Sequence, residues 1–172
     1  MKKPVAGKTP EGLLIEAMKA TFGGDERRIK HALAVLDYAK RISEVEGGDF
    51  QVILSAAVLH DIGIHEAERK YGSPAGHYQE IEGPPIAREI LDRIGMDEDR
   101  VDHVCRIIAN HHSDRDIDTT EFRVIWDADW LVNIPVWYPE MTVEELQRKI
   151  DRVFKTGAGR KIAYSTLLPI SN

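Results

Sequence analysis

The sequence contains a single cysteine, Cys105, among its 172 residues. One cysteine cannot form a disulfide within the chain, which excludes a disulfide-stabilised framework and fits a reducing compartment. Cys105 lies in an apolar pattern with helical spacing, where we expect a buried, unreactive thiol. The lysines at the N-terminus are not followed by an apolar segment, and no apolar run approaches the roughly 20 residues of a membrane helix. We therefore expect a cytoplasmic protein with no membrane partner.

Positive charge is also scarce. The 23 lysines and arginines are outnumbered by 29 aspartates and glutamates, which gives a net charge of -6. Proteins that bind the nucleic-acid backbone usually carry a basic face, so we expect no nucleic-acid polymer as a partner. The length and the 42% of hydrophobic residues suit a single globular domain over residues 1–172.

Several catalytic signatures are missing. The sequence has no HExxH, no CxxC and no GxSxG, which argues against zincins, zinc fingers and serine hydrolases with a nucleophile elbow. The stretch GKTP, which begins at Gly7, lacks the upstream glycine of a phosphate-binding P-loop and follows no predicted strand. The chemistry must therefore come from another set of residues.

No clear alternating strand pattern occurs, and apolar residues recur with the helical period, so the fold class is predicted to be all-α, a compact multi-helix bundle. Asp25 and Asp49 are predicted N-caps, Gly23 and Gly47 predicted helix ends, and Thr142 with Glu145 a predicted capping box. The predicted helices cover 11–22, 26–45, 50–61, 66–71, 84–94, 97–112, 119–136 and 142–155, with one short helix more in the tail.

The stretch GSPAGHYQEIEGPP, residues 72–85, is predicted to be the one long irregular segment, with Pro84 and Pro85 in the first turn of the next helix. We divide the domain into a core over about 25–135 and a C-terminal helical extension over about 140–168.

Histidines and aspartates interrupt the apolar stripes of these helices. Mapped at the helical period, they point inward with their apolar neighbours. The set comprises His31, His60, Asp61, His111, His112 and Asp129. A lone inward histidine is more often a hydrogen-bonded core residue than a ligand. Six such groups in one small core would need many separate polar partners, whereas one or two metal ions would satisfy them together. The pattern therefore predicts a metal site.

The order of these residues resembles the HD-domain superfamily of metal-dependent phosphohydrolases. HALAVLDYAKRI, which begins at His31, is similar to the helix that carries the family's first ligand, and LSAAVLHDIG is similar to its signature helix. IIANHHS resembles the histidine-bearing helix of members that hold two metals. DADWLVN resembles the last-ligand helix, in which Asp129 is followed by Asn133 as in the stringent-response nucleotide hydrolases. The resemblance covers residues 25–135.

The resemblance implies one or two divalent metal ions, among which Fe, Mn, Ni, Co, Zn and Mg are not distinguished. Asp61 would bridge the two ions. The implied ligands are His31, His60 and Asp129 for the first ion and His77, His111 and His112 for the second. Asp127 lies two positions from Asp129, about 200° around the helix, so we interpret it as a structural hydrogen-bonding residue.

The resemblance further implies hydrolysis of a small phosphorylated metabolite or nucleotide by a metal-activated water, with Asp61 as the catalytic residue that orients this water. The Gly-Tyr-Pro segment of the cyclic-dinucleotide phosphodiesterases is missing, which argues against that substrate. Basic residues are needed for the phosphate, and the candidates are Arg69, Lys70, Lys155, Arg160 and Lys161.

Two other functions remain open at this point. The same ligands suit a di-iron oxygenase that cleaves a small organic substrate, as in a minority of the superfamily. A ligand-binding or regulatory module with a degenerate site is a third interpretation, against which the complete ligand set argues. Two of the three tryptophans lie in WLVNIPVWYP, where a homodimer interface and a core position are both compatible with the sequence.

Overall fold

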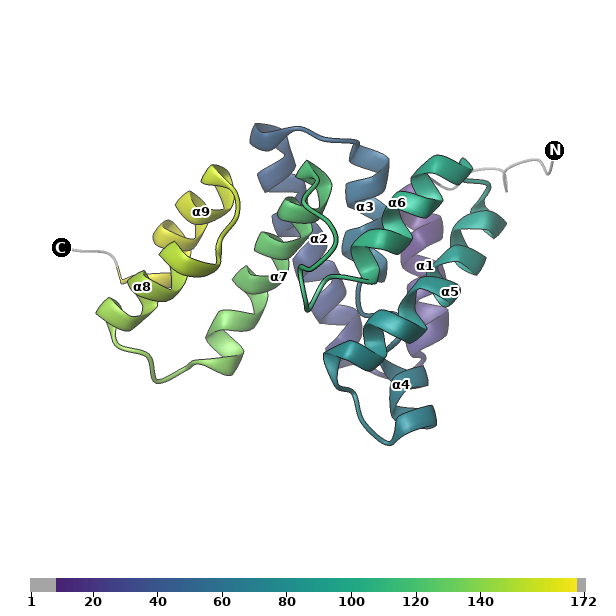
Figure 1. Cartoon of the computed structure of the whole chain (residues 1–172), viewed down its shortest axis with the longest axis horizontal. Helices are drawn as coiled ribbons and strands as arrows, with labels where there is room; N and C mark the ends of the chain where they lie inside the picture. Colours follow the sequence, from purple (N-terminus) through teal and green to yellow (C-terminus); the bar gives the residue numbers. More distant parts are fainter. Residues whose placement is uncertain (1–8, 170–172) are drawn as a thin grey trace.

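The structure is a computed structural model that describes residues 9–169. This part of the chain folds into helices and contains no strand, which confirms the all-α prediction (Figure 1). The helices are α1 (Pro10–Phe22), α2 (Glu26–Glu46), α3 (Phe50–Leu59), α4 (Ile64–Tyr71), α5 (Gly76–Ile94), α6 (Glu98–Ile108), α7 (Thr120–Trp137), α8 (Val143–Val153) and α9 (Gly157–Leu167). Within the described residues, no helix is long and apolar enough to cross a bilayer.

The predicted helix starts are confirmed by their capping hydrogen bonds. The Asp25 carboxylate accepts from the backbone N–H of Arg28, and the Asp49 carboxylate accepts from two N–H groups in the first turn of α3. Thr142 and Glu145 form the predicted capping box at the start of α8. Each cap satisfies backbone donors that have no partner within the helix, which is why these short local patterns fix where the helices begin.

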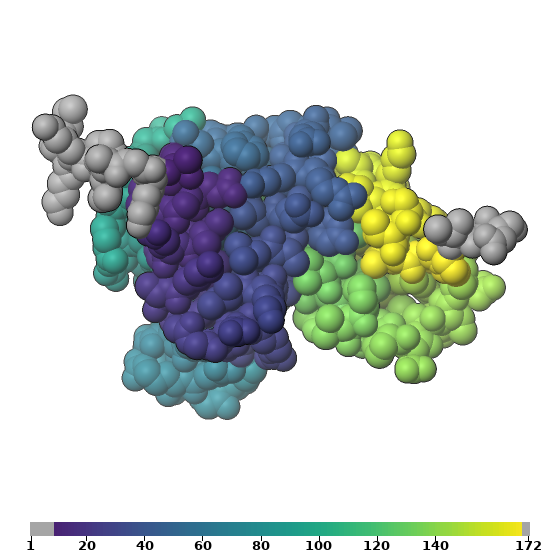
Figure 2. Space-filling view, turned by 180° about the vertical axis from the view of Figure 1, so that it is seen from behind, coloured from purple at the N-terminus to yellow at the C-terminus, as the bar shows by residue number. Residues whose placement is uncertain are grey.

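Helix α3 lies at the centre of the domain because it is apolar on nearly all sides. Every residue from Val52 to Leu59 is buried. Helix α2 packs against both α3 and α7, while α5 and α6 pack against each other and α6 also contacts α3 (Figure 1). Helices α8 and α9 form one end of the molecule, opposite α1 and α5, as the view from behind also shows (Figure 2). This arrangement brings α2, α7 and the end of α3 together.

The prediction of an irregular segment over residues 72–85 is wrong. Helix α5 begins at Gly76 and contains Pro84 and Pro85 in its interior, so these prolines do not occupy a first turn. The physical reason is tertiary packing: a Cβ on Gly63 would lie 2.7 Å from the Cα of Gly83, and a Cβ on Gly83 would lie 2.7 Å from Ile108 Cγ2. Close contact with α4 and α6 therefore holds this segment helical despite its unfavourable propensity.

The contact between Gly63 and Gly83 gives a stability prediction. Gly63→Ala should lower the free energy of unfolding by about 1–3 kcal/mol, because its methyl group would meet the backbone of α5 rather than a side chain that can move. Gly24→Ala is the matched control, since a Cβ there meets nothing within 4 Å and Gly24 has no positive φ. Urea unfolding followed by circular dichroism measures both. Equal stabilities of the two variants would contradict the close packing of α4 on α5.

The predicted helix over residues 97–112 ends earlier, at Ile108, so His111 and His112 lie in a turn after α6. Side-chain donors replace the backbone donors of a continued helix here. Asn110 Nδ2 donates to the carbonyl of Arg106 at 2.9 Å, and His111 Nδ1 donates to the carbonyl of Ile108 at 2.6 Å. Such local hydrogen bonds compete with the helix and end it.

Asp127 has the structural role that the sequence suggested. Its carboxylate accepts from the backbone N–H groups of Lys155 and Thr156, both at 2.8 Å, and from the Thr156 hydroxyl at 2.6 Å. Gly159 permits this contact, because a Cβ there would lie 2.8 Å from Asp127 Cβ. Asp127 thus connects α7 to the start of α9.

Candidate metal centre

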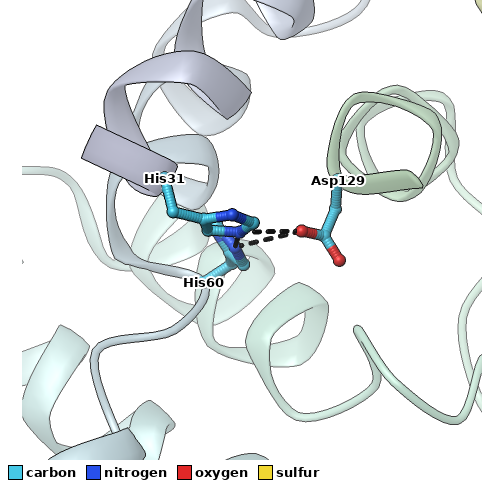
Figure 3. Close-up of side chains that lie close together, drawn as sticks. All are labelled: His31, His60 and Asp129. Atoms are coloured by element: carbon cyan, nitrogen blue, oxygen red, sulfur yellow. Dashed lines mark hydrogen bonds and ion pairs between the residues drawn. The ribbon is translucent and has the colours of Figure 1, made fainter. Parts of the chain in front are cut away.

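Three helices place the side chains of His31, His60 and Asp129 beside one another (Figure 3). His31 Nε2 lies 3.0 Å from Asp129 Oδ1 and 3.2 Å from His60 Nε2. His60 Nε2 in turn lies 3.5 Å from the same Asp129 oxygen. Two imidazole nitrogens and a carboxylate oxygen therefore converge on one point.

A hydrogen bond of the ring nitrogen that faces away from the cluster fixes the orientation of the His60 ring. The side chain is fully buried at the end of α3, and its Nδ1 lies 2.9 Å from the backbone carbonyl of Ala57. Because a carbonyl oxygen only accepts, Nδ1 donates, and in the neutral ring Nε2 presents a lone pair to the cluster. A hydrogen bond of this kind to the remote ring nitrogen is typical of histidines that bind metals.

Asp61 lies between this group and a second one. One carboxylate oxygen, Oδ2, is 3.6 Å from His31 Nε2 and 3.5 Å from His60 Nε2. The other oxygen, Oδ1, is 3.4 Å from His111 Nε2. Asp61, His111 and His112 each offer a ligand atom within 4.8 Å of the others. The two oxygens of Asp61 therefore face two different sets of ligands, as a carboxylate that bridges two cations would.

The Nε2 atom of His111 indicates whether the second ligand group fits a cation. Its Nδ1 donates to the carbonyl of Ile108, so Nε2 of the neutral ring is an acceptor. This Nε2 is buried and has no hydrogen-bond partner among the described residues. A buried acceptor without a donor is costly, and a cation held by His111, His112 and Asp61 would remove the cost. The residues present thus fit a metal ion.

The electrostatics of the cluster also favour a cation. Burial alone would lower the pKa of His60, but the nearby Asp61 and Asp129 carboxylates outweigh it and raise the pKa to about 9. Burial would raise the pKa values of Asp61 and Asp129, yet the surrounding histidines hold both well below their ordinary range. Without a metal, the cluster therefore binds a proton on His60 at neutral pH, where a metal ligand must be deprotonated.

This competition predicts a pH dependence of metal binding. Because the pKa of His60 is about 9, lowering the pH from 8 to 6 should weaken Mn²⁺ binding, by up to about tenfold per pH unit for each proton released. Isothermal titration calorimetry in buffers of different ionisation enthalpy measures the released proton directly. An affinity for Mn²⁺ that stays constant from pH 6 to pH 8 would contradict the protonation of His60 in the metal-free protein.

Of the seven ligands implied by the resemblance, the structure brings together six, namely His31, His60, Asp61, His111, His112 and Asp129. His77 belongs to neither group and is exposed on the first turn of α5, where its ring packs against Tyr78. Asn133, four residues after Asp129, is buried in the wall of the adjoining cavity.

A cavity of about 400 Å³ opens beside the cluster, with His31, Asp61 and Asp129 in its wall. This volume lies within the range of small-molecule sites. Arg27, Arg28 and Lys30 also line it. The sequence pattern did not single out these basic residues. Arg27 and Arg28 precede His31 by four and three positions on the same predicted helix, so helical spacing could have indicated both.

The basic residues proposed from the sequence for the phosphate do not line this cavity. Arg69 forms a bidentate hydrogen bond with Glu66 on the exposed side of α4. Lys155 Nζ donates to Asp114 at 2.8 Å, and Arg160 donates to the carbonyl of Phe154 at 3.2 Å. Arg69, Lys155 and Arg160 are thus engaged at other surfaces, and their predicted contact with a substrate stays a prediction.

Comparison with known proteins identifies the family. The family model described as the HD domain matches residues 28–134. Among solved structures, a predicted HD superfamily hydrolase from an uncultured Thermotogales bacterium superposes with a TM-score of 0.66 at 25% sequence identity, covering 90% of this chain and 83% of the other. An HD-superfamily hydrolase from Bacillus thuringiensis has a TM-score of 0.63 at 22% identity, covering 88% and 86% of the two chains, and supports the fold alone. No curated protein matched. The match over most of the chain, together with the ligand cluster that the same residues form, shows that this protein belongs to the HD-domain family.

Proposed function

We propose that this protein is a metal-dependent phosphohydrolase that acts on a small phosphorylated metabolite or nucleotide. The observation that carries the proposal is the position of Asp61, whose two oxygens face two groups of imidazole ligands beside a cavity with basic residues in its wall. The description of the Thermotogales relative as a hydrolase supports the same reaction class.

In the proposed reaction, the residues of the two ligand groups have distinct roles. The two ligand groups would hold divalent ions, which when bound would lower the pKa of water and stabilise negative charge on phosphoryl oxygens. Asp61 holds an attacking water in place and accepts hydrogen bonds from it, because its carboxylate lies between both groups. His60 and His111 keep their Nε2 atoms directed at the cluster through their Nδ1 hydrogen bonds.

Two kinds of residue in the cavity wall suit a phosphate ester. Arg27 makes no ion pair or hydrogen bond with any residue that the structure describes, so its charge is available to a phosphate. Arg28 is already paired with Asp25 and Glu68. Val136 and Trp137 also line the cavity and are 70% and 51% exposed. Apolar side chains exposed at a cavity favour contact with the organic part of a substrate.

The proposal is tested with a panel of phosphate monoesters and diesters, including nucleotides, in the presence of Mn²⁺, Mg²⁺, Zn²⁺, Ni²⁺, Co²⁺ or Fe²⁺. We expect metal-dependent release of phosphate or of a phosphate monoester, which is lost on chelation and in His60→Ala. Oxygen consumption and an EPR signal of a mixed-valence di-iron centre are measured in parallel. Substrate-dependent oxygen uptake without phosphate release would replace the proposal by the oxygenase alternative.

Arg27 gives a prediction about substrate binding. Arg27→Ala should raise KM about 10-fold or more for the best phosphate ester, since a hydrogen bond to a charged group contributes about 1.5–3 kcal/mol, while kcat changes less. Arg69→Ala is the matched control, because Arg69 carries the same charge but pairs with Glu66 away from the cavity. Steady-state kinetics of both variants decide the matter. A larger effect of Arg69→Ala than of Arg27→Ala would contradict the assigned position of the phosphate.

A further inference from the structure

Gln79 is a buried amide on α5 that also lines the cavity beside the cluster. Its Nε2 donates to the carbonyl of Pro74 at 2.7 Å. Because a carbonyl only accepts, this contact distinguishes the amide nitrogen of Gln79 from its oxygen. The other end, Oε1, is buried and has no hydrogen-bond partner among the described residues. Gln79 thus has an unpaired oxygen, just as His111 has an unpaired nitrogen.

The start of α5 packs against His112 and against the turn that follows Asp61, and both residues belong to the second ligand group. A Cβ on Gly76 would lie 2.7 Å from Cγ of the His112 ring, and Glu80 accepts a hydrogen bond from the backbone N–H of His112 at 3.0 Å. A Cβ on Gly63, two residues after Asp61, would lie 3.0 Å from the backbone oxygen of Gln79. Gln79 therefore occupies the stretch of helix that runs between Asp61 and His112.

The register of α5 favours Gln79 over His77 as the residue that faces the second ligand group. His77 precedes Gln79 by two residues, which places the two side chains about 200° apart around the helix. Gln79 is 5% exposed, whereas His77 is exposed and packs against Tyr78. Of the two, the residue on the inner face of α5 is Gln79.

We propose that Gln79 Oε1 is a ligand of a divalent cation held by Asp61, His111 and His112, in the place that the family resemblance assigned to His77. The inference rests on the metal site of the proposed function and adds a ligand to it. Two buried acceptors without donors, His111 Nε2 and Gln79 Oε1, border the same group, and one cation satisfies both. An amide oxygen is a hard, neutral ligand, so this second site should favour Mn²⁺ or Mg²⁺ and bind more weakly than one with a third imidazole.

Calorimetric titration of the metal-free protein with Mn²⁺ tests the inference without any assay of activity. We expect two binding events in the wild type. Gln79→Leu should weaken the second event by at least about 10-fold, the effect typical of losing a group that supports a metal site, and leave the first within threefold. His77→Ala is the matched control and should bind both ions as the wild type does.

A second variant keeps the test decisive if Gln79→Leu fails to fold, which circular dichroism reports. Gln79→Glu keeps an oxygen at the same place and adds a negative charge, so it should tighten the second event despite losing the hydrogen bond to Pro74. Wild-type binding in both Gln79 variants, or loss of the second event in His77→Ala, would overturn the inference. If the wild type binds no Mn²⁺ at all, the proposed function fails as well; if it binds one ion that the Gln79 variants leave unchanged, this inference alone fails.

Discussion

Replacing Asp61 with asparagine is expected to lower the metal-dependent hydrolytic activity by at least about 10³-fold, equivalent to about 4 kcal/mol of transition-state stabilisation. The substitution keeps the size of the side chain but removes the negative charge between the two ligand groups. It also turns one oxygen into an amide nitrogen, which cannot bind a cation. Because Asp61 faces both groups, we expect it to affect both Mn²⁺ binding events. Initial rates on the best phosphate ester, with calorimetry on the same samples, measure the effect.

Asp116→Asn is the control for Asp61→Asn, since it removes the same charge from an exposed position outside the cluster. It should leave the rate and the metal affinity within about twofold of the wild type. Substantial activity in Asp61→Asn with metal binding intact would mean that Asp61 does not connect the two groups, and the assigned reaction would then lack its central residue.

Asp127 and Asp129 lie two residues apart on α7 and have different roles, which gives a second prediction. Asp129→Ala should weaken metal binding at the first group by about 10²-fold or more and abolish activity, since it removes an anionic ligand beside His31 and His60. Asp127→Ala should instead lower the free energy of unfolding by about 2–4 kcal/mol, because it leaves the buried N–H of Thr156 and the partly buried N–H of Lys155 unpaired.

The two effects are separated by combining calorimetry with urea unfolding of the metal-free variants. Metal affinity should survive in Asp127→Ala at temperatures where it remains folded. The reverse outcome, with metal lost in Asp127→Ala and stability lost in Asp129→Ala, would exchange the roles assigned to these two carboxylates.

Local patterns explain why much of the fold could be predicted. Asp25, Asp49 and Thr142 each satisfy backbone donors within three residues, so the start of a helix is visible in the sequence alone. The position of His60 and Asp61 at the end of an apolar helix similarly indicated a buried polar site. The convergence of α2, α3 and α7 on that site came from the resemblance, since no local pattern brings residues 31, 60 and 129 together.

The prediction failed where tertiary contacts override propensity. Glycines and prolines indicated a loop over residues 72–85, but the glycines at 76 and 83 allow α5 to approach its neighbours closely and form a helix there. That error concealed the helical register. In a loop, His77 looks like a free ligand, whereas in α5 it lies on the outside and Gln79 on the inside.

The basic residues predicted from the sequence do not line the cavity, for a related reason. Charge density indicated the tail around Arg160, and proximity in sequence indicated Arg69, but neither reveals which face of a helix borders a cavity. Arg27 lies one turn before His31 on α2, on the side of the helix that lines the site. Counting back by helical turns from each predicted ligand would have identified it.

Anomalous diffraction from crystals of the protein grown with Mn²⁺ tests the central claim most directly. We expect an anomalous peak between Nε2 of His31 and of His60 and the carboxylates of Asp61 and Asp129, with ligand distances of about 2.0–2.3 Å. A structure at saturating Mn²⁺ in which these four side chains contact only water and one another would contradict it.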